Sequence, residues 1–129
     1  MKLKFNHVHY RSSNLEATKT FYCGVLGGEF VGGKELSGRT HLHIKLGGQS
    51  LFFAPNPDEN PREAESATER LGVYHIAFEV DDHDKAVAFY KERGAKFVSE
   101  SLRPSPDLKV AFIEAPDGMQ VELMEILVE

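Results

Sequence analysis

Hydrophobic and polar residues alternate along several short stretches of the chain, which is typical of β-strands that bury one face. In residues 4–11 the alternation puts two sets of side chains on opposite faces: Phe5, His7, His9 and Arg11 on one, and Asn6, Val8 and Tyr10 on the other. The spacing then changes to that of a helix with the inward stripe Leu15, Thr18, Phe21 and Tyr22. We therefore expect a strand over residues 4–11 and a helix over Leu15–Cys23, with Asn14 as its N-cap.

The rest of the first half reads as three further strands. Gly27-Gly28 ends the predicted helix and leads into a strand at Glu29–Gly32. Two more strands are expected at His41–Leu46 and Ser50–Ala54, and Gly47-Gly48 between them is a hairpin signal.

The second half shows the same succession of patterns. A strand over Tyr74–Val80 leads to Asp81 and Asp82, either of which can cap a helix over about Asp84–Arg93. Pro116-Asp117-Gly118 forms the last turn. The remaining strands of this half are expected at Lys96–Glu100, Lys109–Glu114 and Met119–Glu125.

The two halves are a sequence repeat. With a shift of 68 positions, His7 falls on His75 and Phe21-Tyr22 on Phe89-Tyr90. Each half therefore predicts one βαβββ module, and the fold class is α+β. We expect one domain over residues 1–129, made of module 1 (about 4–55), a linker (about 56–72) and module 2 (about 73–127). The linker has three Pro and many charges within residues 54–72, which favours a surface connector. A helical turn over Arg62–Arg70 is compatible with it, and a lid over a pocket is the alternative.

Composition and charge exclude several classes of function. The net charge is −5 and the basic residues are scattered, whereas a protein that grips nucleic acid or an anionic membrane needs a basic cluster. The single cysteine, Cys23, rules out an internal disulfide. The N-terminal sequence lacks the apolar core of a signal peptide, and no apolar stretch approaches the roughly 20 residues that span a bilayer. We therefore expect a cytoplasmic protein without nucleic-acid or membrane partners.

Three residues form a candidate metal site. His7 and His75 occupy the same place in the two repeats, and Glu122 lies on the last predicted strand, pointing opposite to Val121 and Leu123. Imidazole and carboxylate groups suit Zn, Ni, Mn or Fe(II), and three such ligands leave positions open for water or substrate. Taken singly, each residue is more simply a hydrogen-bonded His or an exposed Glu, so the repeat relationship carries the hypothesis.

The order of the short motifs resembles the vicinal oxygen chelate superfamily, which includes glyoxalase I, methylmalonyl-CoA epimerase, fosfomycin-resistance transferases, extradiol dioxygenases and bleomycin-binding proteins. These motifs are His7-Val-x-Tyr, Phe21-Tyr22, Leu26-Gly27, Tyr74-His75-Ile76-Ala77-Phe78-x-Val80-Asp81 and Ala115-Pro116-Asp117-Gly118-x-x-x-Glu122-Leu123. The resemblance covers nearly the whole chain. It implies a curved mixed sheet around one divalent metal ion (Fe, Ni, Zn or Mn), with His7, His75 and Glu122 as ligands, a small-molecule substrate and a homodimer.

Departures from the family pattern narrow the reaction. Glyoxalase I and the epimerase usually add a fourth, carboxylate ligand, and its position here is either Leu51 or Phe52. The dioxygenases carry a Tyr where this chain has Phe112, and no His follows His83. The transferases hold a phosphonate with cationic groups, for which Arg103 and Lys109 are the candidates. The resemblance favours glyoxalase-like lyase or isomerase chemistry, with Fe(II)-dependent ring cleavage or a non-catalytic antibiotic-binding protein as alternatives.

Further candidates line the expected pocket. His9, His41 and His43 are weak candidates for a general base, and a solvent-facing or hydrogen-bonding His is the simpler interpretation of each. Phe52, Phe112 and Met124 are the predicted substrate pocket, with a place in the core as the alternative. Tyr10 and Arg11 are interpreted as residues that pack and pair with acids, with substrate orientation as the alternative.

Overall fold

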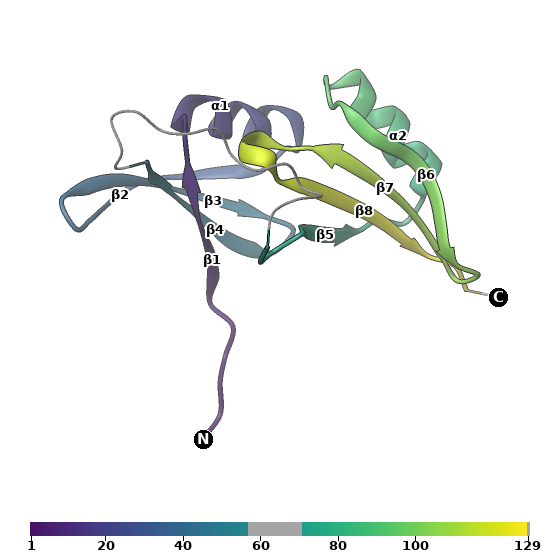
Figure 1. Cartoon of the computed structure of the whole chain (residues 1–129), viewed down its shortest axis with the longest axis horizontal. Coiled ribbons are helices and arrows are strands. Elements are labelled where there is room, and N and C mark those ends of the chain that lie inside the picture. The colour runs from purple at the N-terminus through teal and green to yellow at the C-terminus, as the bar shows by residue number, and fades with distance from the viewer. Residues whose placement is uncertain (57–70, 129) are drawn as a thin grey trace. The chain divides into compact units, whose positions relative to one another are not determined.

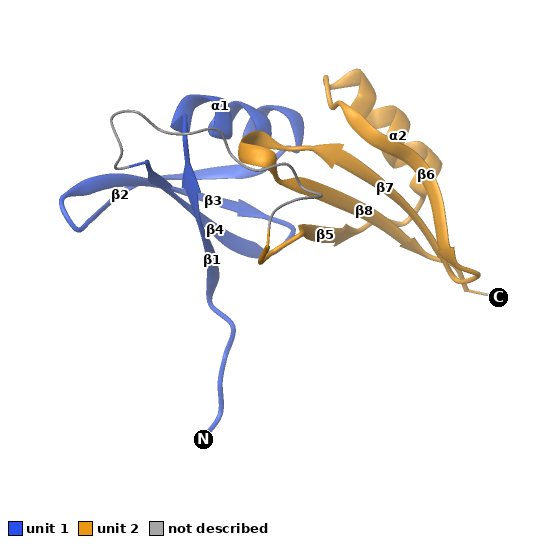
Figure 2. Cartoon of the chain, viewed as in Figure 1, with its two compact units in different colours: residues 1–62 blue, residues 63–129 orange. Residues whose placement is uncertain are grey.

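The computed structural model describes residues 1–56 and 71–128. The chain divides into two compact units, Met1–Arg62 and Glu63–Glu129, which Figure 2 distinguishes by colour. The predicted helical turn over Arg62–Arg70 and most of the predicted linker lie outside the described residues. Among the described residues, no helix has the length and apolar character needed to cross a bilayer.

The first unit is a four-stranded mixed sheet with one helical segment (Figure 1). Its strands are β1 (His7–Ser12), β2 (Glu29–Leu36), β3 (Arg39–Leu46) and β4 (Gln49–Pro55). Their order across the sheet is β1-β4-β3-β2, with β1 parallel to β4 and the other neighbours antiparallel. The hairpin between β3 and β4 turns at Gly47 and Gly48, which both have positive φ, as a tight two-residue turn requires.

The helical segment of the first unit begins as an α-helix and continues as a π-helix. Asn14 is the N-cap of α1 (Leu15–Lys19), because its side-chain Oδ1 accepts a hydrogen bond from the Ala17 amide at 3.0 Å. From Thr20 to Val25 the chain forms the π-helical segment η1. The predicted helix over Leu15–Cys23 is therefore present and capped as expected, but its second half has a wider turn than the helical spacing indicates.

Sheet alternation divides the first unit into a core face and an outer face. On the core face, Ile44, Leu51 and Phe53 are almost fully buried. So is Tyr22 of η1, whose ring centroid lies 4.8 Å from that of Phe53. Gly28, after the helical segment, lies between it and the sheet: an added Cβ would lie 2.7 Å from the Tyr22 carbonyl oxygen of η1 and 3.0 Å from Ile44 Cγ2 of β3. The opposite face of β1 carries the odd-numbered residues His7, His9 and Arg11, as the sequence pattern predicts.

The second unit repeats this plan. Its strands are β5 (His75–Glu79), β6 (Phe97–Ser105), β7 (Leu108–Glu114) and β8 (Gln120–Ile126), in the order β5-β8-β7-β6. Again the first and last strands, β5 and β8, pair in parallel. The helix α2 (His83–Glu92) is capped by Asp82, whose Oδ1 accepts from the Lys85 amide at 3.1 Å, so Asp82 and not Asp81 is the N-cap.

A buried histidine ties α2 to its sheet. His83 is 2% exposed, and its Nε2 lies 3.2 Å from the carbonyl oxygen of Val110 on β7. Its backbone amide donates to Glu125 Oε1 on β8 at 2.6 Å. The turn between β7 and β8 is the 3₁₀ segment η2 (Pro116–Gly118), where Asp117 and Gly118 both have positive φ.

The α+β class and the two βαβββ modules are confirmed. The expected bounds were too short mainly at β2 and β6, which continue to Leu36 and Ser105 instead of ending at Gly32 and Glu100. The first strand begins at His7 rather than at residue 4.

Candidate metal and substrate site

The three predicted metal ligands are divided between the two units. His7 lies on β1 of the first unit, whereas His75 on β5 and Glu122 on β8 belong to the second. Over the described residues, no group of three or more His, Cys, Asp or Glu side chains is arranged to hold a metal ion. The second unit thus brings two of the three residues together, and each unit is considered by itself below.

His75 and Glu122 meet on one face of the second sheet. In the register between β5 and β8, Ala77 is aligned with Glu122. His75 lies two residues before Ala77 on β5, so its side chain is on the same face of the sheet as that of Glu122. His75 Nε2 and Glu122 Oε1 are 3.6 Å apart, with side chains 24% and 14% exposed. Two donors that bind one ion at about 2.1 Å and a tetrahedral angle lie about 3.4 Å apart. The pair therefore has a separation that suits two ligands of one divalent ion.

The ring of His75 is held in place, but only one of its nitrogens faces Glu122. That nitrogen is Nε2, whereas Nδ1 is buried and has no hydrogen-bond partner among the described residues. An ion on Nε2 would leave Nδ1 without a partner, so the buried Nδ1 does not by itself support a metal site. Two aromatic rings fix the imidazole from the sides: the ring centroid of Tyr74 lies at 4.4 Å and that of Phe112 at 5.2 Å.

His7 has one ring nitrogen engaged and its ring packed. Its Nδ1 forms a 2.7 Å hydrogen bond with Asn6 Oδ1. Because the Asn6 oxygen accepts, the proton stays on Nδ1 and Nε2 keeps its lone pair, which is how outer hydrogen bonds commonly prepare a histidine for a metal. The ring lies edge-on to Phe52, with centroids 4.9 Å apart.

The strand registers decide which residue replaces the family's fourth ligand. In the second sheet, Ala77, two residues after His75, faces Glu122. In the first sheet, His9, two residues after His7, faces Phe52. Phe52, not Leu51, is thus the counterpart of Glu122, while Leu51 points into the core and is 2% exposed. An apolar ring occupies the position where a carboxylate would complete a four-ligand set.

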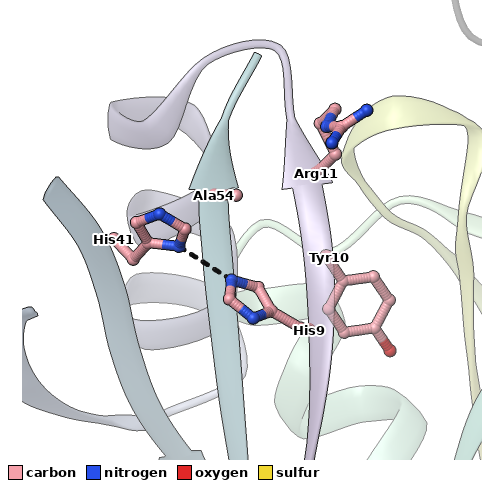
Figure 3. A pocket seen from close by; sticks show the side chains of 5 residues that line it. All are labelled: His9, Tyr10, Arg11, His41 and Ala54. Carbon is pink, nitrogen blue, oxygen red and sulfur yellow. Dashed lines mark hydrogen bonds between the residues drawn. The ribbon is translucent and has the colours of Figure 1, made fainter. Parts of the chain in front are cut away.

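His9 and His41 form a hydrogen-bonded pair across the first sheet. His9 Nε2 and His41 Nδ1 are 2.8 Å apart, although their strands β1 and β3 are separated by β4. Figure 3 shows the two rings pointing toward each other in front of β4. They line a cavity of about 370 Å³ together with Tyr10, Arg11 and Ala54. Burial, followed by the neighbouring His41 and His7, lowers the pKa of His9 below its usual value.

His43, the third candidate base, packs flat on Phe52. Their ring centroids are 4.3 Å apart at an interplanar angle of 15°, and His43 Nε2 lies 3.0 Å from Ser50 Oγ. Burial and the positive charges of Lys45 and Lys34 lower the pKa of His43. The Lys34 ammonium lies 5.7 Å from the centroid of the Phe52 ring. Positively charged side chains are therefore close together on this part of the sheet.

The predicted apolar pocket residues are placed on two different sheets. Phe112 on β7 pairs with Glu122, and Met124 follows two residues later on β8, so both lie beside the candidate ligands of the second unit. Phe52 belongs to the first unit and contacts His7, His9 and His43.

Two residues near these sites were not predicted from the sequence. Tyr74 packs on both His75 and Phe112, and the signal for it is its place directly before a candidate ligand. Lys34 lies beside His41 in the register between β2 and β3. It was missed because the strand was expected to end at Gly32.

Comparison with known proteins places the chain among related sequences. A family model described as the Glyoxalase/Bleomycin resistance protein/Dioxygenase superfamily matches residues 4–123. The uncharacterized protein YaeR of Escherichia coli is 31% identical, with 93% of this chain and 94% of YaeR covered. The metallothiol transferase FosB of Staphylococcus epidermidis is 29% identical, over 92% of this chain and 78% of FosB.

One further relative is a longer protein, and another has a known crystal structure. A probable chloroplastic lactoylglutathione lyase of Arabidopsis thaliana is 30% identical over 96% of this chain, which corresponds to 36% of that longer protein. A crystal structure of a glyoxalase family protein from Enterococcus faecalis is 32% identical, with 95% of this chain and 97% of that chain covered and a TM-score of 0.77.

Proposed function

The chain belongs to the glyoxalase/bleomycin resistance protein/dioxygenase superfamily, and on that premise we propose that it is a divalent-metal-dependent enzyme. Its substrate would be a small organic molecule that presents two neighbouring oxygen atoms. His7, His75 and Glu122 would hold one ion of Fe, Ni, Zn or Mn. The observation that carries this proposal is the 3.6 Å approach of His75 Nε2 to Glu122 Oε1.

The chemistry of the donors supports the assignment. Two imidazoles and one carboxylate suit these metals and leave coordination positions for substrate oxygens. A bound ion of this kind would act as a Lewis acid that polarises the two oxygens of the substrate. Phe112 and Met124 of the second unit would line the substrate site beside Glu122, because Phe112 is aligned with Glu122 and Met124 follows it two residues later on β8.

Within this class we propose glyoxalase-like lyase or isomerase chemistry. A thiol transfer is the second candidate, because Phe52 at the fourth ligand position leaves three protein ligands and because FosB is a relative of similar length. Fe(II)-dependent ring cleavage and non-catalytic antibiotic binding are the remaining alternatives. The homodimer that the family resemblance implies belongs to the same proposal, and light scattering in solution would test it.

Metal analysis of the purified chain tests the proposal. We expect about one equivalent of a divalent metal after anaerobic purification and reconstitution, and a large loss of metal in His7→Ala, His75→Ala and Glu122→Gln. Glu79→Gln is the matched control, because Glu79 is an exposed residue of β5 on the same sheet. Less than about a tenth of an equivalent in the wild-type chain would favour the binding protein, since catalysis needs a stably held ion.

A substrate screen tests the type of reaction independently of metal binding. Thiohemiacetals of 2-oxoaldehydes, catechols with oxygen, and fosfomycin with a thiol each probe one of the three reaction types. Turnover of the first and not of the others supports the leading candidate. A metal-loaded chain that turns over none of them, yet binds an antibiotic, contradicts the enzymatic part of the proposal.

A further inference from the structure

The outer face of the first sheet concentrates basic side chains in a chain whose net charge is −5. We call it the basic face and define it by six residues: His9, Arg11, Lys34, His41, His43 and Lys45. Glu29 is aligned with Lys45 at its corner. Within the described residues, no ion pair joins Arg11, Lys34 or Lys45 to a carboxylate. Three fixed positive charges on one side of a small sheet repel one another, so a bound anion would stabilise this arrangement.

A cavity lies within the basic face. It is lined by His9 and Arg11 from β1, His41 from β3 and Ala54 from β4, and its volume is about 370 Å³. Ala54 lies on β4, between the strands of the two histidines, and its short side chain leaves space there for the cavity. Figure 3 shows Arg11 further along β1 than His9, beyond the histidine pair. A cavity of this size suits a small group rather than a macromolecule.

The histidine pair keeps a hydrogen-bond donor available in either tautomer. Two neutral imidazoles hold two ring protons, and one of them lies in the 2.8 Å hydrogen bond between His9 Nε2 and His41 Nδ1. The other proton must then be on His9 Nδ1 or on His41 Nε2. The pair therefore always presents one outward N–H. Arg11 adds a guanidinium with five donors in a fork that matches the two oxygens of a carboxylate or phosphate.

We propose that the basic face binds an anionic group, a carboxylate or a phosphate-type oxyanion, through Arg11, Lys34 and the outward N–H of the His9–His41 pair. Lys34 belongs to this set because it is aligned with His41 on the neighbouring strand β2. The inference rests on the proposed function in one respect: the anion is a substituent of the small molecule whose oxygens the metal would hold. The binding itself uses only residues of the first unit.

The test is a titration of the full chain with sodium phosphate, methylphosphonate and acetate, each compared with chloride at equal ionic strength. It is followed by two-dimensional NMR of the backbone amides, on the protein as isolated and after treatment with a chelator. We expect saturable shifts at β1, β3 and β4 with at least one of the three anions in both preparations. Shifts with phosphate and methylphosphonate alone identify a phosphate-type group, and shifts with acetate alone identify a carboxylate.

Variants locate the site. Arg11→Gln and Lys34→Gln remove exposed charges and should each weaken binding at least about tenfold, because a charge-assisted contact of about 1.4 kcal/mol corresponds to that factor. His41→Gln breaks the histidine pair and removes one of the two nitrogens that can carry its outward proton, and the fold of this variant is checked by circular dichroism. Lys96→Gln, an exposed lysine of the second unit, is the control and should bind as the wild-type chain does.

Three results would overturn the inference: no saturable shift with any of the anions, shifts only in the second unit, or wild-type affinity in both Arg11→Gln and Lys34→Gln. A chain that holds metal but fails this titration loses the anion site and keeps the proposed function. A chain that binds the anions but no metal keeps the anion site and loses the proposed function.

Discussion

Phe52 is the residue that most distinguishes this chain from a four-ligand metal protein. It faces His9 in the same way that Glu122 faces Ala77, and it is 9% exposed between His7, His9 and His43. Three imidazoles thus surround a position that is occupied by an apolar ring. A carboxylate there would lie among groups that can donate hydrogen bonds to it.

Replacing Phe52 by Glu should create a fourth ligand. We expect Phe52→Glu to tighten metal binding about tenfold or more, equivalent to about 1.4 kcal/mol. The same change removes a packed aromatic ring, so the metal-free variant should unfold more easily than the wild-type chain. Metal affinity by competition with a chromophoric chelator, and thermal unfolding with and without metal, measure the two effects.

The matched control is Phe52→Gln, which has the size of the Glu variant without its charge. It should lose stability in the same way and gain no metal affinity. If both variants bind metal equally, or if neither is stabilised by it, then position 52 does not face the ion and His7 is not a ligand with His75 and Glu122.

Sequence alternation predicted which side chains share a face, but it did not identify Phe52. The faces of β1 and β3 follow from period-two alternation and are confirmed by the contact between His9 and His41. The choice between Leu51 and Phe52 depends on the register between β1 and β4, which are far apart in sequence. A one-residue slip exchanges the two faces, and no local pattern excludes it.

At the scale of the elements, the edge strands β2 and β6 were the least predictable. β2 continues through Gly32-Gly33 with a register shift after Phe30, and β6 continues through Pro104 with several such shifts. Glycine and proline usually signal the end of a strand. An edge strand has one side without a partner in its sheet, so it accommodates bulges and a residue that lacks an amide hydrogen. Lys34 was missed for this reason.

The close approach of η1 to β3 gives a prediction with an internal control. A Cβ at Gly28 would lie 2.7 Å from the Tyr22 carbonyl oxygen and 3.0 Å from Ile44 Cγ2, so Gly28→Ala should cost about 1–3 kcal/mol of unfolding free energy. At Gly24, within η1, the nearest atom would be 3.9 Å away. Gly24→Ala should therefore be neutral, or stabilise by up to about 1 kcal/mol.

Urea denaturation followed by circular dichroism measures both glycine variants. The contrast between them is the informative quantity, since both substitutions add the same methyl group. Equal destabilisation at both positions would mean that the close contacts of position 28 with Tyr22 and Ile44 are not what limits the side chain there.

At the scale of the whole molecule, the proposed ligand set takes one residue from the first unit and two from the second. An ion that binds the folded chain stabilises it by about 2.7 kcal/mol when its free concentration is a hundred times its Kd. We therefore expect metal to raise the thermal midpoint and a chelator to lower it. Because the ligands come from both units, His7→Ala and Glu122→Gln should each abolish the shift, which differential scanning calorimetry would detect.

A shift that survives in His7→Ala would show that the second unit binds the ion alone. The Glu79→Gln chain provides the reference, because it keeps all three proposed ligands and changes the charge by the same amount as Glu122→Gln. Its thermal midpoint should respond to metal as that of the wild-type chain does.

The parallel pairing of β1 with β4 has a consequence for folding during synthesis. The strand that carries His7 is made before its hydrogen-bonding partner, which ends at Pro55, and the register joins His7 to Ser50. Neighbours on the nascent chain, such as β3 and β4, can pair as soon as they emerge, whereas β1 must wait for a long loop to close. We expect an interrupted translation product that stops before Gln49 to contain the β2–β3 hairpin and the helix, with β1 still unpaired.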